Sequence, residues 1–283
     1  MTYSEIEYVI DGPVRIIRFN RPRLRNCIGP VTHRELVDAW TRFRDDESAL
    51  VAVITGAGAD AFCAGGDLTA DTGLVPEDPD EVARHDRGEA DGVLGPSRWT
   101  DIYKPVIAAV NGVAYAGGLE WACFADIRIA ESHASFGITC RRWNIGLADG
   151  GSQRLPRIIG MGRAMELILT GRVIDAEEAL RIGLVNEVTP AGEGLSRALE
   201  LAHLIAALPQ PALRGDKEAA VRGYGVDLKT GLTIEAQCFN RSIRDPATRE
   251  GVRRFRERDH PDRALGSAPA TPGLVRSPAP PNH

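Results

Sequence analysis

The stretch KPVIAAVNGVAYAGGLEWACFADIRIA, residues 104–130, decides how this chain is expected to fold. Its apolar run over 105–110 predicts a buried strand that ends in a turn at Asn111-Gly112. A helix is predicted after the glycine pair Gly117-Gly118, and a second strand over 127–130. A strand, a glycine turn, a helix start and another strand therefore follow one another within this one stretch.

The start of that helix also suggests chemistry. A helix that begins at paired glycines presents unpaired backbone N–H groups and the positive end of its dipole to the space in front of it. Glu120 follows Gly117 by about one helical turn, so its carboxylate can face the same space. Donors for a developing oxyanion and a candidate proton carrier are thereby placed together. Because a lone glutamate among apolar and glycine neighbours is costly to bury, catalysis is the favoured interpretation of Glu120.

The flanking segments predict alternating strands and helices. Alternation of apolar residues predicts a β-hairpin over 5–20, with a turn at Asp11-Gly12-Pro13. A helix is expected over 32–44, where apolar residues recur at helical spacing, followed by a buried strand over 50–55. Further helices are expected over 193–208, 216–224, 227–243 and 246–258. This order favours an α/β fold in which helices cover sheets.

The composition is that of an ordinary soluble globular protein, with 43% hydrophobic and 26% charged residues among 283. The formal net charge of −5 argues against a nucleic-acid partner, and nothing in the charge pattern indicates a membrane. The five cysteines are scattered without the spacing of metal ligands, so no metal site is expected. The N-terminal residues lack a basic segment followed by an apolar core, and a reducing, cytoplasmic location is expected.

Two other segments carry weaker indications. In AFCAGGDL, residues 61–68, small residues follow a strand, so backbone can approach a ligand and leave an N–H group free. Taken alone, a glycine pair at such a place is more often a simple turn. The acidic, Gly- and Pro-rich residues 72–100 are typical of a mobile loop or a short helix over the surface. Ser152 is expected to cap a helix that follows Gly150-Gly151.

Six blocks in this order and spacing resemble the enoyl-CoA hydratase/isomerase (crotonase) superfamily over about residues 5–260. They are FNRPRLRN at 19–26, VITGAGADAFCAGGDL at 53–68, KPVIAAVNGVAYAGG at 104–118, ADIRIA at 125–130, GGSQRLPRIIGMGRAMELILTGR at 150–172 and EALRIGLVNEV at 178–188. The resemblance implies an α/β fold, a crotonase-like spiral of ββα units with a helical C-terminal region, assembled as a homotrimer or a dimer of trimers.

The same resemblance implies a division of the chain. Residues 1–190 are expected to form the spiral core, and residues 191–263 the helical region that makes trimer contacts and covers coenzyme A. Residues 264–283 are low in complexity and rich in Pro, Ala, Ser and Gly, so they are expected to be disordered.

The family's substrate is an acyl-CoA thioester, so coenzyme A would enter as part of the substrate and no separate cofactor is expected. In the family, two backbone N–H groups grip the thioester oxygen, and the matching positions are Gly66 and Gly117. Enolate-forming chemistry needs such an oxyanion hole because a thioester α-proton is only weakly acidic; one donor is typically worth about 10²–10³ in rate.

The resemblance also implies where coenzyme A would lie. Backbone around Ala64 and Leu68 would line the adenine and pantetheine track, and Arg25 lies in the entrance loop. Phe255 and Arg258 match positions on the terminal helix that help to cover coenzyme A, often from a neighbouring subunit.

The catalytic pair departs from the family pattern. Hydratases of the family hold one water between two glutamates, and the first corresponds to Glu120. Counting back from Gln153-Arg154-Leu155 without a gap puts the second at Cys140, whose thiol holds water weakly and has an unperturbed pKa of about 8.5. Asp149 lies near where some family members carry an aspartate that transfers protons or acts as a nucleophile. A catalytic role and a role in fixing the glycine turn or capping the helix at Gly150 both remain open for Asp149.

These features predict an enzyme of enoyl-CoA hydratase type, which adds water to a 2-enoyl-CoA through an oxyanion-stabilised thioester enolate. Glu120 is the expected acid/base, Asp149 the candidate second carboxylate, and Cys140 a substrate contact. The nearest alternative is an enoyl-CoA isomerase or another enolate reaction such as decarboxylation, since isomerisation requires only one mobile carboxylate. A non-catalytic acyl-CoA binder is a further alternative, because the second glutamate position is changed while the oxyanion glycines are kept.

Overall fold

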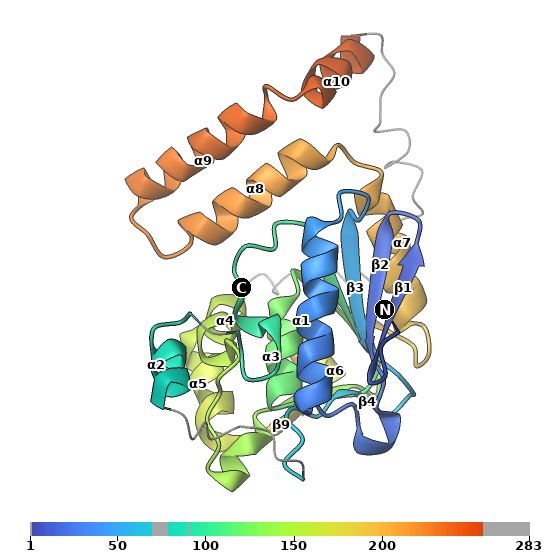
Figure 1. The fold of residues 1–283 in the computed structure, drawn as a ribbon, viewed down its shortest axis with the longest axis vertical. Helices are drawn as coiled ribbons and strands as arrows, with labels where there is room; N and C mark the ends of the chain where they lie inside the picture. The colour runs from blue at the N-terminus through green and yellow to red at the C-terminus, as the bar shows by residue number, and fades with distance from the viewer. Residues whose placement is uncertain (1, 70–78, 90, 257–283) are drawn as a thin grey trace, which may run out of the picture.

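Two sheets organise the chain in a computed structural model, which describes residues 2–69, 79–89 and 91–256 (Figure 1). The larger sheet has, in spatial order, β1 (Ile6–Asp11), β2 (Val14–Phe19), β3 (Val51–Gly56), β5 (Val106–Val110), β7 (Ile127–Glu131) and β10 (Glu187–Thr189). The smaller sheet has β4 (Ala61–Cys63), β6 (Val113–Tyr115), β8 (Ser135–Gly137) and β9 (Val173–Asp175). The predicted hairpin is confirmed, because β1 and β2 pair antiparallel, whereas the other neighbours in the larger sheet run parallel.

The chain winds as a spiral of strand–strand–helix units. After the hairpin of β1 and β2, the next units pass from a strand of the larger sheet to a short strand of the smaller sheet and then to a helix. In one unit β5 and β6 lead into α3 (Gly117–Phe124), and in another β3 and β4 lead into α2 (Pro79–Asp86). The crotonase-like spiral of ββα units is therefore confirmed. The short strands β4 and β6 lie where only glycine turns were expected. They were not predicted because three residues are too few to show the alternation of a strand.

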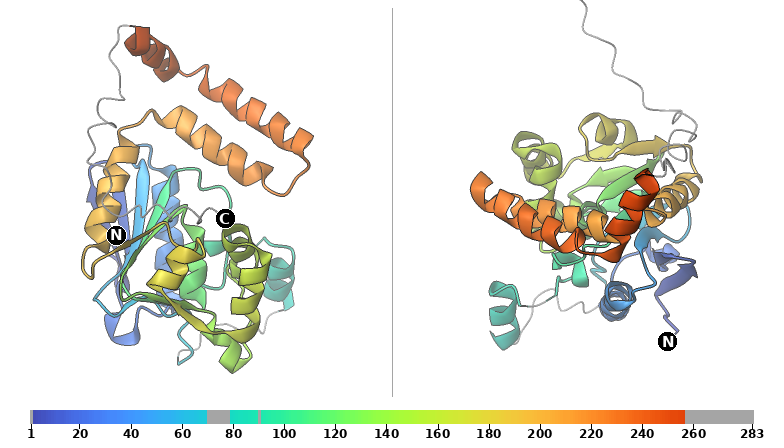
Figure 2. Two further views of the ribbon diagram at one scale, coloured as in Figure 1. Left: turned by 180° about the vertical axis from the view of Figure 1, so that it is seen from behind. Right: turned by 90° about the horizontal axis from the view of Figure 1, so that it is seen from above.

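Both faces of the larger sheet are covered, which explains why its strands read as continuous apolar runs. In β3, Ala52 and Ile54 face the core that α1 (Pro30–Asp45) helps to form. Val51 and Val53 alternate with them and pack in a second core, against α7 (Gly194–Ala206) on the opposite face (Figure 2). The predicted helix over 32–44 is confirmed as α1, which begins two residues earlier, at Pro30, because proline suits the first helical position.

Shorter helices carry the rest of the spiral. They are η1 (Pro22–Leu24), η2 (Pro96–Arg98), η3 (Thr139–Trp143), α4 (Gly151–Ile159), α5 (Met161–Thr170) and α6 (Ala176–Arg181). The prediction that Ser152 caps α4 is wrong. Gly150 is the N-cap residue, with φ of 100°, so Ser152 is already inside the first turn, and its exposed side chain makes no cap hydrogen bond.

The C-terminal helices α8 (Gln210–Gly223), α9 (Leu228–Ser242) and α10 (Pro246–Arg256) project from this body. The helices α8 and α9 pair side by side and lie across the top of the spiral (Figures 1 and 2). The boundary expected at residue 190 would place α7 in the same C-terminal region as α8, α9 and α10. In the structure, however, α7 packs on the larger sheet. Arg258 and the tail over 264–283 lie outside the described residues. Within the described ranges, every helix is too short or too polar to cross a lipid bilayer.

Candidate active site

Two glycine turns meet at the centre of the site. One follows β4 and includes Cys63–Gly66, and the other precedes α3 and includes Ala116–Gly118. A Cβ atom on Gly118 would lie 1.8 Å from the carbonyl oxygen of Cys63, and one on Gly65 would lie 3.0 Å from the amide nitrogen of Gly117. Gly65 also has a φ of 94°, which L side chains rarely adopt. Only glycine therefore lets the two backbones approach so closely.

The amide groups of Gly66 and Gly117 remain free in this arrangement. Among the described residues neither N–H group has a hydrogen-bond acceptor, as expected for Gly117 at the first position of a helix. Both glycines line one cavity of about 510 Å³. The geometry therefore brings together the two glycine turns that sequence patterns indicated separately.

Glu120 projects into the same cavity from the first turn of α3 and is 3% exposed. Its Oε1 atom accepts hydrogen bonds from the amides of Asp149 (2.9 Å) and Gly151 (2.8 Å). Burial, followed by the negative charge of Asp149, raises the pKa of the Glu120 carboxyl to about 7, against the lowering effect of these amides. At neutral pH Glu120 is thus available both as a carboxylic acid and as a carboxylate.

Asp149 is the second carboxylate of the cavity and is 2% exposed. Its Oδ1 atom accepts hydrogen bonds from the amide of Leu94 (2.9 Å) and the hydroxyl of Ser97 (2.5 Å). Burial raises its pKa, although these bonds and the charges of His33 and Arg98 oppose the rise. The capping interpretation of Asp149 is wrong, because the carboxylate ties the segment 92–97 to the site and no described side chain caps α4.

The segment 92–97 is the part of the site that sequence reasoning missed. Residues 72–100 were expected over the surface; α2 fits this expectation, but Leu94 is only 5% exposed. The two methyl groups of Leu94 lie against both glycine turns, within 2.0 Å of a Cβ built on Gly117 and 3.4 Å of one on Gly66. The indole N–H of Trp121 donates to the Leu94 carbonyl oxygen (3.1 Å), so α3 holds the segment as well. In the sequence, the apolar pair Val93-Leu94 inside an acidic stretch is the one signal that could have indicated that this segment is buried at the site.

Cys140 lies in η3 and lines the cavity, with 7% of its surface exposed. Burial, and to a lesser extent the charge of Glu120, raises the pKa of the thiol above its usual value. The thiol is therefore protonated at neutral pH and cannot act as a base there. Among the described side chains that line the cavity, only Glu120 and Asp149 carry a carboxylate.

The residues expected to contact coenzyme A lie in two places. Ala64 and Leu68 line the cavity, and the amide of Ala64 donates to the carbonyl oxygen of Arg25 (3.0 Å) at the edge of the same turn. Phe255 lies far away on α10, 67% exposed, and is not in the cavity wall that the described residues of its own chain form. Arg258 is outside the described residues.

In the described ranges no group of three His, Cys, Asp or Glu side chains is placed to hold a metal ion.

Comparison with known proteins agrees with this geometry. The family model described as enoyl-CoA hydratase/isomerase matches residues 10–263. The chain belongs to the enoyl-CoA hydratase/isomerase family, and so to the crotonase superfamily.

Relatives of this family member resemble it over most of its length. A crotonyl-CoA hydratase of Syntrophomonas wolfei is 36% identical over 91% of this chain and 97% of its own length. An (E)-benzylidenesuccinyl-CoA hydratase of Thauera aromatica is 35% identical over 89% of this chain and 96% of its own. The crystal structure of an enoyl-CoA hydratase from Mycobacterium tuberculosis has a TM-score of 0.81 and 33% identity, covering 90% of this chain and 96% of that one. The protein is therefore an enzyme of the crotonase superfamily, with the spiral fold of its relatives.

Proposed function

We propose that this protein is an enoyl-CoA hydratase, which adds water to the double bond of a 2-enoyl-CoA. The observation that carries the proposal is the meeting of two free backbone amides, Gly66 and Gly117, over a cavity into which Glu120 projects. Relatives at about 36% identity that are named hydratases support the same reaction. An oxyanion hole beside a carboxyl of pKa about 7 suits a reaction whose intermediate is a thioester enolate.

In the proposed mechanism the thioester oxygen accepts hydrogen bonds from the amides of Gly66 and Gly117. As the oxygen of water bonds to the β-carbon, one carboxylate takes a proton from that water and negative charge moves onto the thioester oxygen. The two amides stabilise this charge because they are already oriented and need no reorganisation. The enolate then collapses as the α-carbon takes a proton from a carboxylic acid, so that one water has been added in total.

We propose Glu120 and Asp149 as the two carboxyl groups that move these protons. Both have raised pKa values, mainly because both are buried, and the charge of Asp149 further raises the pKa of Glu120. Backbone amides fix one oxygen of Glu120, and the segment 92–97 fixes one oxygen of Asp149. Cys140, at the position expected for the second glutamate, is proposed as a substrate contact because its thiol stays protonated. The proposal requires no further cofactor, since amides supply polarisation and carboxyl groups supply proton transfer.

The remaining substrate contacts are proposed from their places in the fold. Ala64 and Leu68 would line the track of coenzyme A, with Arg25 at its entrance. Phe255 and Arg258 would cover coenzyme A from a neighbouring copy rather than from their own chain. We keep the cytoplasm as the proposed compartment, because all five cysteines are free thiols, as is usual in a reducing environment.

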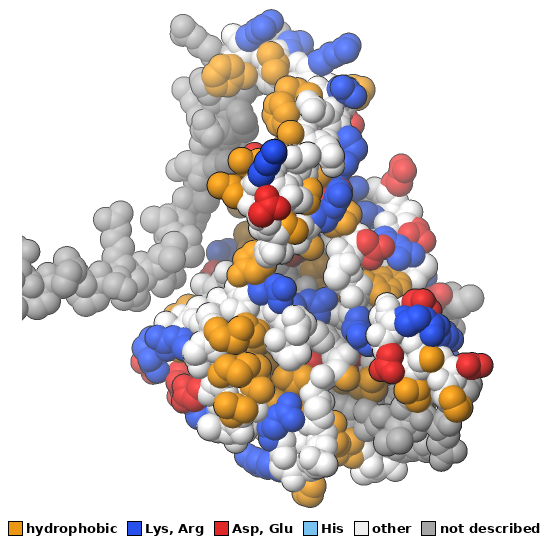
Figure 3. Space-filling view, turned by 90° about the vertical axis from the view of Figure 1, so that its left-hand side faces the viewer, with side chains coloured by type: hydrophobic (Ala, Val, Ile, Leu, Met, Phe, Trp, Pro, Cys, Tyr) orange, Lys and Arg blue, Asp and Glu red, His pale blue; other side chains and the backbone are white. Residues whose placement is uncertain are grey.

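The helices α8 to α10 are proposed to make the contacts of a trimer or a dimer of trimers. Figure 3 shows hydrophobic side chains on the surface of this projecting part, interspersed with Lys and Arg. Leu228, Phe239 and Phe255 are 78%, 55% and 67% exposed. Apolar surface of this kind is usually covered by another protein chain. Analytical ultracentrifugation should give a mass of three or six chains, and a monomer would exclude this arrangement.

The proposed reaction is tested with purified protein and 2-enoyl-CoAs of short and medium chain length. Hydration should remove the ultraviolet absorbance of the conjugated thioester and give a product heavier by one water. A product of unchanged mass would indicate isomerisation instead. Tight binding of acyl-CoA without any product would indicate a binder, and would contradict the proposed function.

A further inference from the structure

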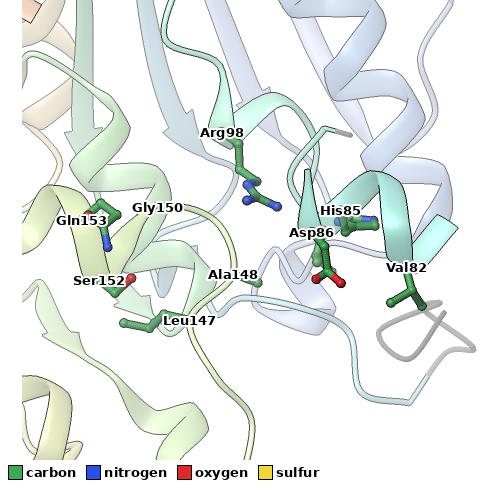
Figure 4. A pocket seen from close by; sticks show the side chains of 10 residues that line it. Val82, His85, Asp86, Arg98, Leu147, Ala148, Gly150, Ser152 and Gln153 are labelled. Atoms are coloured by element: carbon green, nitrogen blue, oxygen red, sulfur yellow. The ribbon is translucent and has the colours of Figure 1, made fainter. Parts of the chain in front are cut away.

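A second cavity, of about 530 Å³, adjoins the catalytic cavity; Figure 4 shows the side chains that line it. The two cavities share Val93, Leu147 and Ala148 in their walls. Ala64 and Leu68, on the proposed track of coenzyme A, line the first cavity but not the second. An acyl chain that leaves the oxyanion hole past these three shared residues, away from coenzyme A, would extend toward the second cavity.

The wall of this second cavity combines apolar residues with several polar side chains. Side chains of α2 lie on one side, the start of α4 lies on the other, and Arg98 lies between them (Figure 4). The polar side chains in the wall are His85, Asp86, Arg98, Ser152 and Gln153. A long alkyl chain placed here would remove water from these groups without offering them hydrogen bonds, which is unfavourable. The cavity thus suits an acyl group with a polar end.

Among the described residues that line this cavity, Arg98 is the one whose side chain always carries a positive charge. Its guanidinium has neither a hydrogen bond nor an ion pair with any described residue, and Asp86 across the cavity does not pair with it. Its backbone is nevertheless well fixed, because it ends η2 directly after Ser97, whose hydroxyl donates to Asp149. Its positive charge reaches the catalytic cavity, since it opposes the rise in the pKa of Asp149. Arg98, an exposed residue, therefore places a guanidinium that pairs with none of the described residues in the wall of the second cavity.

We infer that the acyl group of the substrate carries a carboxylate beyond its double bond, and that the guanidinium of Arg98 binds this carboxylate. A planar guanidinium can donate two parallel hydrogen bonds to a carboxylate, which an alkyl or ester end cannot accept in the same way. The hydroxyl of Ser152 and the amide of Gln153 offer further donors on the side away from Asp86. The inference rests on the proposed function and names the class of substrate, an unsaturated dicarboxylic acid joined to coenzyme A by one thioester.

The test compares 2-hexenedioyl-CoA with 2-hexenoyl-CoA, which differ in the carboxylate at the end of a chain of equal length. The wild-type enzyme should prefer the first in kcat/KM by about 10- to 100-fold, the range expected for a partly exposed charged hydrogen bond. Arg98→Met should reduce kcat/KM for the carboxylate substrate about 10- to 100-fold more than for 2-hexenoyl-CoA, and Arg98→Lys should retain part of the preference. A wild-type preference for 2-hexenoyl-CoA, or an equal loss for both substrates in Arg98→Met, would overturn the inference.

The matched control is Arg84→Met, which removes the same charge from an exposed position on α2 outside the cavity wall. It should leave the preference unchanged; loss of the preference in this variant would mean that general surface charge, not Arg98, selects the substrate. Calorimetric binding of adipyl-CoA and hexanoyl-CoA, which cannot be hydrated, separates this inference from the proposed function. Tighter binding of adipyl-CoA that Arg98→Met removes would support the inference even without hydratase activity. Equal binding of the two would overturn it whatever the hydratase assay shows.

Discussion

Two walls face the cavity, and they differ in how they are built. The glycine wall consists of residues 63–66 and 116–120, and its donors are backbone amides. The loop wall consists of Val93, Leu94 and residues within 139–149, and it presents side chains, among them Leu94 and Asp149. The glycine wall has almost no freedom, since even a methyl group on Gly118 would overlap the backbone of Cys63. On the proposed mechanism, the difference teaches that backbone amides would polarise the thioester, whereas proton transfer and substrate choice would depend on exchangeable side chains.

The largest effect should come from Glu120, the side chain of the glycine wall that we propose to transfer a proton. Glu120→Gln should lower kcat for hydration by about 10³-fold, because an amide cannot transfer the proton. The amide oxygen of Gln can still accept from the amides of Asp149 and Gly151, so the fold should persist. Steady-state hydration of 2-enoyl-CoA, with circular dichroism to check the fold, measures this. Activity above about a tenth of wild type would remove Glu120 from the mechanism.

Gly118→Ala tests the rigidity of the glycine wall. Its Cβ would lie 1.8 Å from the Cys63 carbonyl oxygen, so the two turns must move apart and the amides of Gly66 and Gly117 no longer converge. We expect kcat/KM to fall by about 10²-fold or more, together with a lower melting temperature. The control is Gly162→Ala on α5, where a Cβ meets nothing within 4 Å and neither activity nor stability should fall. Equal behaviour of the two variants would contradict the proposed oxyanion hole.

Asp149→Asn tests whether Asp149, in the loop wall, transfers a proton or only holds the segment 92–97 in place. The amide oxygen of Asn can still accept from Leu94 and Ser97, so the segment 92–97 should stay in place. The ionisable group is lost, and we expect kcat to fall by about 10²-fold with little change in KM. Near-normal kcat in Asp149→Asn, combined with a large loss in Asp149→Ala, would reduce Asp149 to a positioning residue.

The smallest predicted effect concerns stability and pH. The pKa of Glu120 is about 7 in the folded protein, above its value in the unfolded chain, so the folded state holds this proton more tightly. The unfolded chain therefore ionises first as pH rises from about 4.5 to about 7, and the folded protein loses stability across that window. Glu120→Gln should remove this loss, so its stability advantage over wild type should grow by about 2 kcal/mol between pH 5 and pH 8.

Urea unfolding of both proteins at those two pH values measures the difference. The same comparison in the Asp149→Asn background sharpens the contrast between the walls, because the charge of Asp149 is one cause of the raised Glu120 pKa. There the pH-dependent advantage should be smaller. A constant advantage across the pH range in the wild-type background would mean that Glu120 titrates normally in the folded protein.

Much of the glycine wall could be predicted from sequence, because each of its parts is local. Apolar runs marked β3 and β5, and the pair Gly117-Gly118 marked the helix start that carries Glu120. The loop wall could not be predicted in the same way. Asp149 bonds to Leu94 across 55 positions of the chain, and nothing near either residue specifies that contact. For the same reason the unpaired Arg98 and its cavity were not foreseen.

The sequence by itself determined the order of strands and helices, the places where only glycine is tolerated and the acidic residue beside them. These features follow from side-chain periodicity and backbone sterics, which act over a few neighbouring residues. The tertiary structure decided that Gly66 and Gly117 line one cavity, that Asp149 and Glu120 line it too, and that Arg98 lines a second cavity beside it. The physical reason is that pKa values, cavity walls and hydrogen-bond partners depend on contacts between distant segments, which exist only once the spiral has closed.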